Sequence, residues 1–222
     1  MIEFQPTYIT FDCYGTLTFF QMGALTRQLV ADIVPADQVD TFVKDFEGQR
    51  FDEVLGPWKP YPDVVKDSFR KTLKRWNLEY READGQALVD AVPTWGPHPD
   101  VPDALRALAS RYPLVILSNA ADDQIGSNVE KLGVPFHAVY TAQQAQAYKP
   151  RFQAFHYMFD QLGCGPGDIL HVSSSLRYDL MTAHDLRVTN KVYVNRGYEP
   201  MNPYYGYHEV KDLSGLPPLL GL

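Results

Sequence analysis

The chain has 222 residues, 45% of them apolar, which is enough to bury a core and to hold one domain with an insertion. A formal net charge of -7 and the absence of any long basic run argue against nucleic acid or an anionic membrane as the main partner. Two cysteines, Cys13 and Cys164, exclude a disulfide framework and fit a reducing compartment.

The first residues do not combine a basic region with an apolar stretch, and no uncharged run reaches the roughly 18 residues that a membrane span needs. We therefore expect an unprocessed, soluble protein in the cytoplasm.

The first element is a buried strand over residues 8–11, which ends at Asp12. Ligands of open parallel α/β sheets bind at the carboxyl ends of the strands, so Asp12 is a candidate functional carboxylate. Gly15 allows a sharp turn, and Thr16 can offer a hydroxyl beside the carboxylate. A purely structural strand-Asp-turn is the alternative.

A mainly helical block follows, with no strand in it. Apolar residues at spacings of three and four predict a helix over 19–33, and similar patterns predict helices over 40–55, 64–76 and 86–92. The proline and glycine residues between 93 and 102 mark the return to an α/β region.

Strands and helices alternate from there, which is typical of a parallel sheet. We expect strands over 114–117, 136–140, 169–172 and 191–194, the last being the final strand. Helices are expected over 103–111, 122–132, 152–162 and 176–186. The segment 198–207 is expected to be irregular, and it could contact a second copy of the chain in a homodimer.

Polar residues stand at the ends of several of these strands. Ser118 and Asn119 end the second one, where they could cap a helix or bind an anion. Lys149 stands before a proline in a loop, either as a solvated charge or as the cation between two carboxylates at one sheet edge. Asp179 is the second such carboxylate, unless it is an ordinary acid of the first helical turn.

These motifs, in this order, resemble the four motifs of the haloacid dehalogenase superfamily. Asp12 to Leu17 resembles the first motif in the form with Tyr14 that hydrolytic 2-haloacid dehalogenases carry, and Leu117 to Asn119 resembles the second. Lys149-Pro150 is similar to the third motif, and Ser174 to Asp179 to the fourth. The resemblance implies a doubly wound parallel α/β core, residues 1–17 and 97–222, with an inserted helical cap over 18–96.

The resemblance also implies a reaction, the hydrolysis of short 2-haloacids. Asp12 would attack C2, halide would leave, and water would then attack the resulting ester at Asp12 with Asp179 as base or orienting group. Lys149 would balance charge, and Ser118 and Asn119 would hold the substrate carboxylate. Inversion at C2 follows, and no cofactor is expected.

Several positions depart from related patterns. Phosphatases of the superfamily carry acids where this chain has Tyr14 and Ser174, so leaving-group protonation and Mg²⁺ binding should both be poor here. Leu176 replaces an Asn that is common in the dehalogenases, and Arg151 replaces an acidic or small residue. A Mg²⁺-dependent phosphatase is the alternative enzyme, and a binding protein on a decayed core is a further alternative.

A cap arginine faces the leaving halide in the dehalogenases, and this chain offers two candidate cations for that role. Arg50 is the preferred one and Lys44 the second, although either could be a solvated helix charge. The aromatic residues Phe46, Trp58 and Tyr61 could line an apolar pocket or belong to a core.

Overall fold

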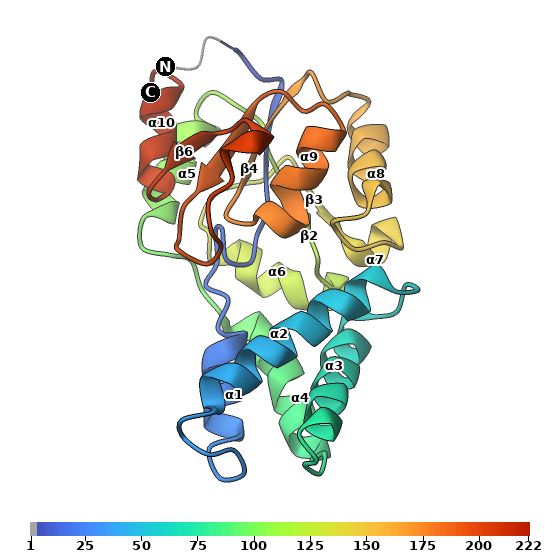
Figure 1. Ribbon diagram of the computed structural model, residues 1–222. Helices are drawn as coiled ribbons and strands as arrows, with labels where there is room; N and C mark the ends of the chain where they lie inside the picture. Colours follow the sequence, from blue (N-terminus) through green and yellow to red (C-terminus); the bar gives the residue numbers. More distant parts are fainter. Residues whose placement is uncertain (1–3) are drawn as a thin grey trace.

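The computed structural model describes residues 4–222. Residues 1–3 lie outside the described residues. They belong to the start of the chain, where the sequence predicts no signal peptide. Figure 1 shows a sheet flanked by helices above a second part of the molecule that is helical. The doubly wound α/β fold expected from the sequence is confirmed.

All strands of the sheet run parallel, in the order β3-β2-β1-β4-β5-β6. Their bounds are Tyr8–Phe11 (β1), Leu114–Ser118 (β2), Ala138–Thr141 (β3), Ile169–Ser173 (β4), Lys191–Val194 (β5) and His208–Val210 (β6). The prediction that β5 is the last strand was wrong, because β6 pairs with it. β6 has three residues of which only Val210 is buried, so it has no alternation to detect.

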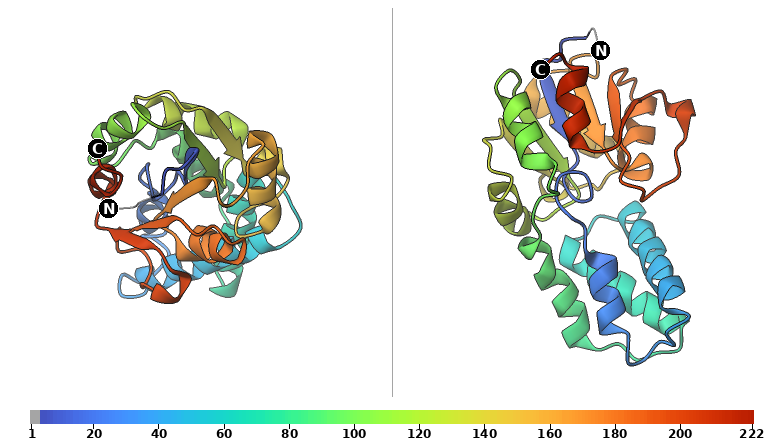
Figure 2. Two further views of the ribbon diagram at one scale, coloured as in Figure 1. Left: turned by 90° about the horizontal axis from the view of Figure 1, so that it is seen from above. Right: turned by 90° about the vertical axis from the view of Figure 1, so that its left-hand side faces the viewer.

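Helices cover both faces of the sheet. One face packs under α5 (Val101–Ala109), α6 (Asp122–Glu130) and α10 (Leu216–Leu219), and the other under α8 (Phe152–Leu162) and α9 (Met181–Asp185). The left view of Figure 2 shows these two layers from above. Alternate residues of one strand explain the two layers, because Leu114 and Ile116 of β2 belong to the first cluster whereas Val115 and Leu117 belong to the second.

The sequence-based helix over 176–186 has a different form. It starts with one π-helical turn, Leu176–Leu180, and continues as α9. A short helix α7 (Ala142–Ala145) leads into the loop that carries Lys149. Single-turn 3₁₀ segments lie at Val92–Thr94, Pro203–Tyr205 and Leu213–Gly215.

Four helices form the second part of the molecule. They are α1 (Met22–Leu29), α2 (Val39–Leu55), α3 (Tyr61–Arg75) and α4 (Glu82–Ala91). α1 is shorter than the predicted 19–33, whereas α2 agrees closely with its prediction. Phe42, Phe46 and Phe69 pack edge to face at the centre, which explains the helical spacing of these apolar residues.

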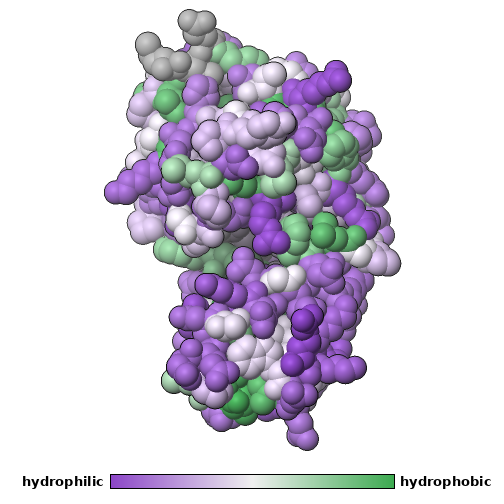
Figure 3. Space-filling model, in the orientation of Figure 1, coloured by the Kyte–Doolittle hydropathy of each residue, from purple (hydrophilic) through white to green (hydrophobic). Residues whose placement is uncertain are grey.

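Two adjacent chain segments join the four helices to the sheet, as the right view of Figure 2 shows. Phe19 donates its N–H to Gly96, His98 donates its N–H to Leu17, and Thr18 bridges Pro97. Within residues 4–222, no helix combines the length and apolarity needed to cross a membrane. Figure 3 shows a mainly hydrophilic surface on both parts and a narrowing between them.

Candidate active site

The predicted catalytic residues meet at the carboxyl edge of the sheet. Asp12 directly follows β1, Ser118 ends β2, and Ser174 follows β4. Asp179 lies on the π-helical turn, and Lys149 reaches the same point from the loop after α7. Parallel strands place their carboxyl ends at one edge, so the motifs converge although more than 160 residues separate Asp12 from Asp179.

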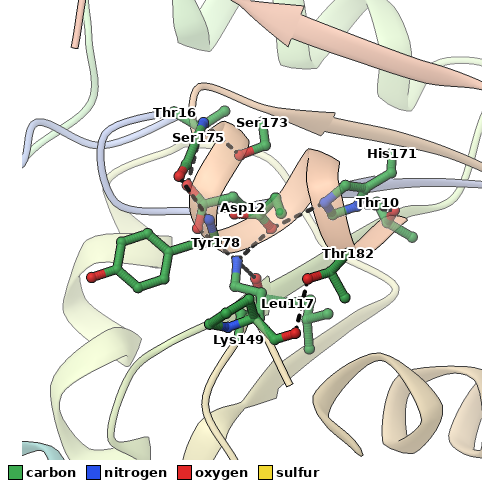
Figure 4. A network of polar contacts seen from close by, with 12 residues as sticks. Thr10, Asp12, Thr16, Leu117, Lys149, His171, Ser173, Ser175, Tyr178 and Thr182 are labelled. Atoms are coloured by element: carbon green, nitrogen blue, oxygen red, sulfur yellow. Dashed lines mark hydrogen bonds and ion pairs between the residues drawn. The ribbon is translucent and has the colours of Figure 1, made fainter. Parts of the chain in front are cut away.

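Lys149 is the centre of this group, as Figure 4 shows. Its side chain is 1% exposed, and its ammonium donates to Asp12 Oδ1 at 2.8 Å, Asp179 Oδ1 at 2.7 Å and the Leu117 carbonyl at 2.8 Å. All three ammonium protons are therefore used. The structure thus places Lys149 between two carboxylates, the position that the sequence predicts for it.

Burial and charge act in opposite directions on the two carboxylates. Burial raises the pKa of Asp12, and the charge of Lys149 offsets only part of this increase. Burial also acts to raise the pKa of Asp179, but Lys149 and a hydrogen bond from His171 outweigh it and leave that pKa below the usual value. Asp179 therefore holds its negative charge more firmly than Asp12 does.

The second oxygen of Asp12 is oriented by Thr16. The Thr16 hydroxyl donates to Asp12 Oδ2 at 2.7 Å and accepts the backbone N–H of Ser174 at 2.8 Å. Gly15 makes the turn between Asp12 and Thr16 at a φ of +90°, and a Cβ there would touch the Ser174 hydroxyl at 3.4 Å. Ser174 thus acts on Asp12 through its backbone and through Thr16.

Ser118 and Asn119 have different surroundings although they are adjacent. The Ser118 hydroxyl is buried, lines the cavity and has no hydrogen-bond partner in the protein. Asn119 accepts the Lys149 N–H at 2.7 Å and donates to the Lys149 carbonyl at 2.9 Å. Asn119 therefore holds the lysine loop in place, with one amide N–H left, while Ser118 has its full hydrogen-bonding capacity available.

Tyr14 lines the cavity with its ring, but its hydroxyl points away from Asp12. That hydroxyl donates to Asn128 Oδ1 at 2.8 Å, and Asn128 in turn donates to the Val92 and Trp95 carbonyls. Burial raises the pKa of Tyr14 far above that of a free phenol. The hydroxyl is therefore a poor acid.

A cavity of about 530 Å³ lies between this polar edge and the four helices. Asp12, Lys149 and Asp179 form part of its floor, and Phe20, Val54 and Val64 contribute apolar surface from the opposite side. Every predicted site residue lines the cavity except Thr16, which donates a hydrogen bond to Asp12 without lining the cavity itself. Of the three aromatic residues singled out in the sequence, only Tyr61 lines it, whereas Phe46 packs among the helices.

Arg50 is the preferred sequence candidate for the cation on the helical side, and it lines the cavity. It lies on the α2 face that also bears Val43, Glu47 and Val54, and its guanidinium stands 5.0 Å from the ring centres of both Phe20 and Phe46. Its Nε is buried without a partner. Lys44 is exposed and does not line the cavity, so the structure favours Arg50 over the second candidate.

The tail after β5 contributes residues that the sequence did not reveal. Tyr198 and Glu199 line the cavity, and Glu199 accepts hydrogen bonds from the Ser175 hydroxyl and from the N–H groups of Leu176 and Arg177. Leu176 itself is buried against Leu180 and Tyr193. A carboxylate at the start of a helix complements its free N–H groups, so Glu199 fixes the segment that leads to Asp179.

Arg151, the other departure from the related motifs, connects the lysine loop to the four helices. Its guanidinium donates to the carbonyls of Leu55 and Gly56 at the end of α2, at 2.5 and 2.6 Å. Tyr148, on the other side of Lys149, donates to the Lys59 carbonyl. The loop that carries the buried lysine is thus attached to the helices on both sides.

The donor set fits Mg²⁺ poorly. The two carboxylates at Lys149, Asp12 and Asp179, each share one oxygen with its ammonium, and the Ser174 hydroxyl already contacts Thr16. Residues 4–222 contain no cluster of three or more His, Cys, Asp or Glu side chains that could hold a metal ion. This donor set therefore disagrees with the Mg²⁺ centre of the alternative enzyme.

Comparison with known proteins places these features in a family context. Residues 7–186 match the model of a family described as haloacid dehalogenase-like hydrolases. The chain is 32% identical to (S)-2-haloacid dehalogenase 4A of Burkholderia cepacia over 221 residues, covering 95% of this chain and 93% of that protein.

Solved structures share the fold over the whole chain. A dehalogenase crystal structure superposes with a TM-score of 0.83 at 24% identity, covering 100% of both chains. The L-2-haloacid dehalogenase of Xanthobacter autotrophicus with covalently bound chloropropionic acid gives a TM-score of 0.78 at 20% identity, covering 98% of this chain and 99% of that one.

Proposed function

Because the chain belongs to the haloacid dehalogenase-like hydrolase family, we propose that it hydrolyses 2-haloacids to 2-hydroxyacids and halide. The relative from Burkholderia cepacia, which is similar over nearly its full length, is a (S)-2-haloacid dehalogenase and supports this substrate class. The observation that carries the proposal is the pair Tyr14 and Ser174. Tyr14 replaces the acid that would protonate the leaving group of a phosphate ester, and Ser174 replaces a carboxylate that would bind Mg²⁺.

The first half of the reaction forms an ester on Asp12. The substrate carboxylate binds the free Ser118 hydroxyl, which places C2 before Asp12. An Asp12 oxygen attacks C2 in line, the carbon–halogen bond breaks, and halide leaves with its bonding electrons. Arg50 offers a cation to that halide across the cavity, and no proton is needed.

The second half hydrolyses the ester. Asp179 lines the cavity, and its Oδ2 is buried without a partner, so this oxygen can take a proton from water. The water oxygen attacks Cγ of Asp12, the bond between Cγ and the ester oxygen on C2 breaks, and the departing alkoxide takes the proton. That ester oxygen is the Asp12 oxygen that attacked C2, so Asp12 keeps the oxygen of the water. Asp12 is regenerated, and the configuration at C2 is inverted.

We propose that residues 18–96 act as a cap over a core formed by 1–17 and 97–222, because α1, α2 and α3 supply the opposite wall of the cavity. The donor set around Asp12 supports a reaction that uses no metal.

The test compares two activities under two conditions. The protein is assayed for halide release from 2-chloropropionate and 2-bromobutanoate, and for phosphate release from small phosphate esters, with EDTA and with added Mg²⁺. We expect halide release that EDTA does not change and phosphate release near background. Asp12→Asn is the inactive control, because an amide cannot form the ester. Robust Mg²⁺-dependent phosphate release without halide release would show that the protein is a phosphatase instead.

A further inference from the structure

His171 is a buried titratable residue that the proposed reaction has not yet used. It lies in the middle of β4, with no exposed surface, among the apolar residues Leu170 and Val172. Its ring packs edge to face on Phe155 of α8, with the ring centres 5.2 Å apart. A histidine in the interior of an apolar strand needs polar partners for both ring nitrogens.

Both partners are present, one on each side of the ring. The register of the sheet pairs Thr10 with His171, and the Thr10 hydroxyl lies 2.8 Å from Nδ1. Nε2 lies 3.0 Å from Asp179 Oδ1. Figure 4 shows Thr10 and His171 side by side, with the ring pointing toward the network around Lys149.

The direction of these hydrogen bonds follows from the carboxylate. An ionised Asp179 has only acceptors, so Nε2 must carry a proton and donate it to Oδ1. Nδ1 can then accept the Thr10 hydroxyl proton, which fixes the tautomer with hydrogen on Nε2. An imidazolium would also donate through Nε2, so the contact with Asp179 does not depend on the charge of the ring.

The two oxygens of Asp179 are consequently unequal. Oδ1 accepts from both Lys149 and His171, whereas Oδ2 is buried without a partner. A proton added at Oδ1 would have to displace one of two donors, but Oδ2 is free to receive it. The hydrogen bond from His171 also restricts rotation of the carboxylate, which would otherwise exchange the two oxygens.

We propose that His171, held by Thr10, is a positioning residue that presents Asp179 Oδ2 to the water that hydrolyses the Asp12 ester. This inference rests on the proposed function and concerns only its second half. The attack of Asp12 on C2 releases halide before Asp179 acts, so loss of His171 should leave the first turnover of halide unchanged. The ester should then accumulate.

Two substitutions separate hydrogen bonding from volume. His171→Gln keeps an amide N–H near the position of Nε2, whereas His171→Leu keeps bulk but removes the donor. A first-turnover burst of halide is measured by rapid quench with 2-chloropropionate, and the alkylated protein is followed by intact-mass spectrometry. We expect His171→Leu to keep the burst rate, lose about tenfold in kcat and accumulate the adduct. His171→Gln should lose threefold or less.

Several results would overturn the inference. They are an unchanged kcat in His171→Leu, equal losses in both variants, or a burst slowed as much as kcat. If His171→Leu does not fold, Thr10→Val, which removes the hydroxyl at nearly constant volume, provides the same readout. Adduct accumulation at an intact burst rate is expected there too, and its absence would overturn the inference. No halide from the wild-type protein would instead overturn the proposed function itself.

Discussion

The two walls of the cavity are built on opposite principles. On the sheet side, Asp12, Lys149 and Asp179 are buried and joined to one another, to the backbone and to Thr16 by hydrogen bonds. On the helical side, apolar side chains such as Val54 and Val64 line the cavity, and Arg50 stacks on two rings with its Nε unpaired. The sheet side is organised before a ligand arrives, whereas the helical side keeps a cation available for one.

The largest effect is expected when the Lys149 ammonium is removed from the sheet side of the cavity. Lys149→Met leaves two buried carboxylates facing each other. Either one of them takes up a proton, or their repulsion lowers the stability of the fold. We expect kcat to fall by at least about 100-fold and the free energy of unfolding by about 3–5 kcal/mol. Urea unfolding and halide release measure the two effects.

Lys44→Met is the matched control for this change. Lys44 lies exposed on α2, and its removal should alter activity and stability within the scatter of surface substitutions, about 0.5 kcal/mol. Equal losses in the two variants would show that the buried lysine has no special role.

Removing the cation on the helical side should affect activity without affecting stability. Arg50→Leu keeps apolar contact with Phe20 and Phe46 but loses the guanidinium, so we expect kcat/KM to fall about thirtyfold. The unfolding temperature should stay the same or rise, because the buried Nε has no partner to lose.

Arg27→Leu tests whether a cation elsewhere at the cavity can do for catalysis what the Arg50 guanidinium does. Arg27 also lines the cavity, but its guanidinium pairs with Asp40 and is half exposed. Its loss should change kcat/KM less than threefold. A larger effect for Arg27 than for Arg50 would reverse the assignment.

Ser118 resembles the helical side although it lies on the sheet side, because its buried hydroxyl is unpaired. Ser118→Ala should therefore leave stability unchanged or slightly higher while lowering kcat/KM about tenfold, since a hydrogen bond to a charged group contributes roughly 1.5–3 kcal/mol. Unchanged kcat/KM for every accepted 2-haloacid would make Ser118 a structural residue only.

The smallest expected effect concerns the connection between the two walls. Arg151→Met removes the hydrogen bonds from the lysine loop to the carbonyls of Leu55 and Gly56. We expect a two- to fivefold rise in KM with kcat nearly unchanged, because Lys149 keeps its own contacts. Exposed Arg75→Met is the control, and a fall in kcat with KM constant would contradict this role.

The sheet side of the site could be predicted from the sequence because its residues follow buried strands. Asp12, Ser118 and Ser174 stand at points where an apolar run ends, and parallel topology alone brings such points together. Asp179 lies on the helical turn that directly follows the third of these points. The helical side has no comparable rule. The periodicity of α2 identified its buried face through Phe42 and Phe46, but which charged residue beside that face meets the cavity depends on how the four helices sit over the sheet.

Two residues were missed for different physical reasons. Glu199 reaches Ser175 from a tail 24 residues away, which is rich in turn-forming residues and shows no periodic pattern. His171 did leave a signal, because a titratable side chain interrupts the apolar strand Ile169–Ser173. The short strand β6 left none, since three residues cannot display alternation.

The central claim is that Asp12 forms a covalent ester, and oxygen labelling tests it most directly. A single turnover of 2-chloropropionate by excess enzyme is run in H₂¹⁸O, and both the peptide containing Asp12 and the 2-hydroxyacid are analysed by mass spectrometry. We expect ¹⁸O in the Asp12 carboxylate and none in the product of the first turnover. Label in that first product, with Asp12 unlabelled, would mean that water attacks C2 directly and would contradict the mechanism.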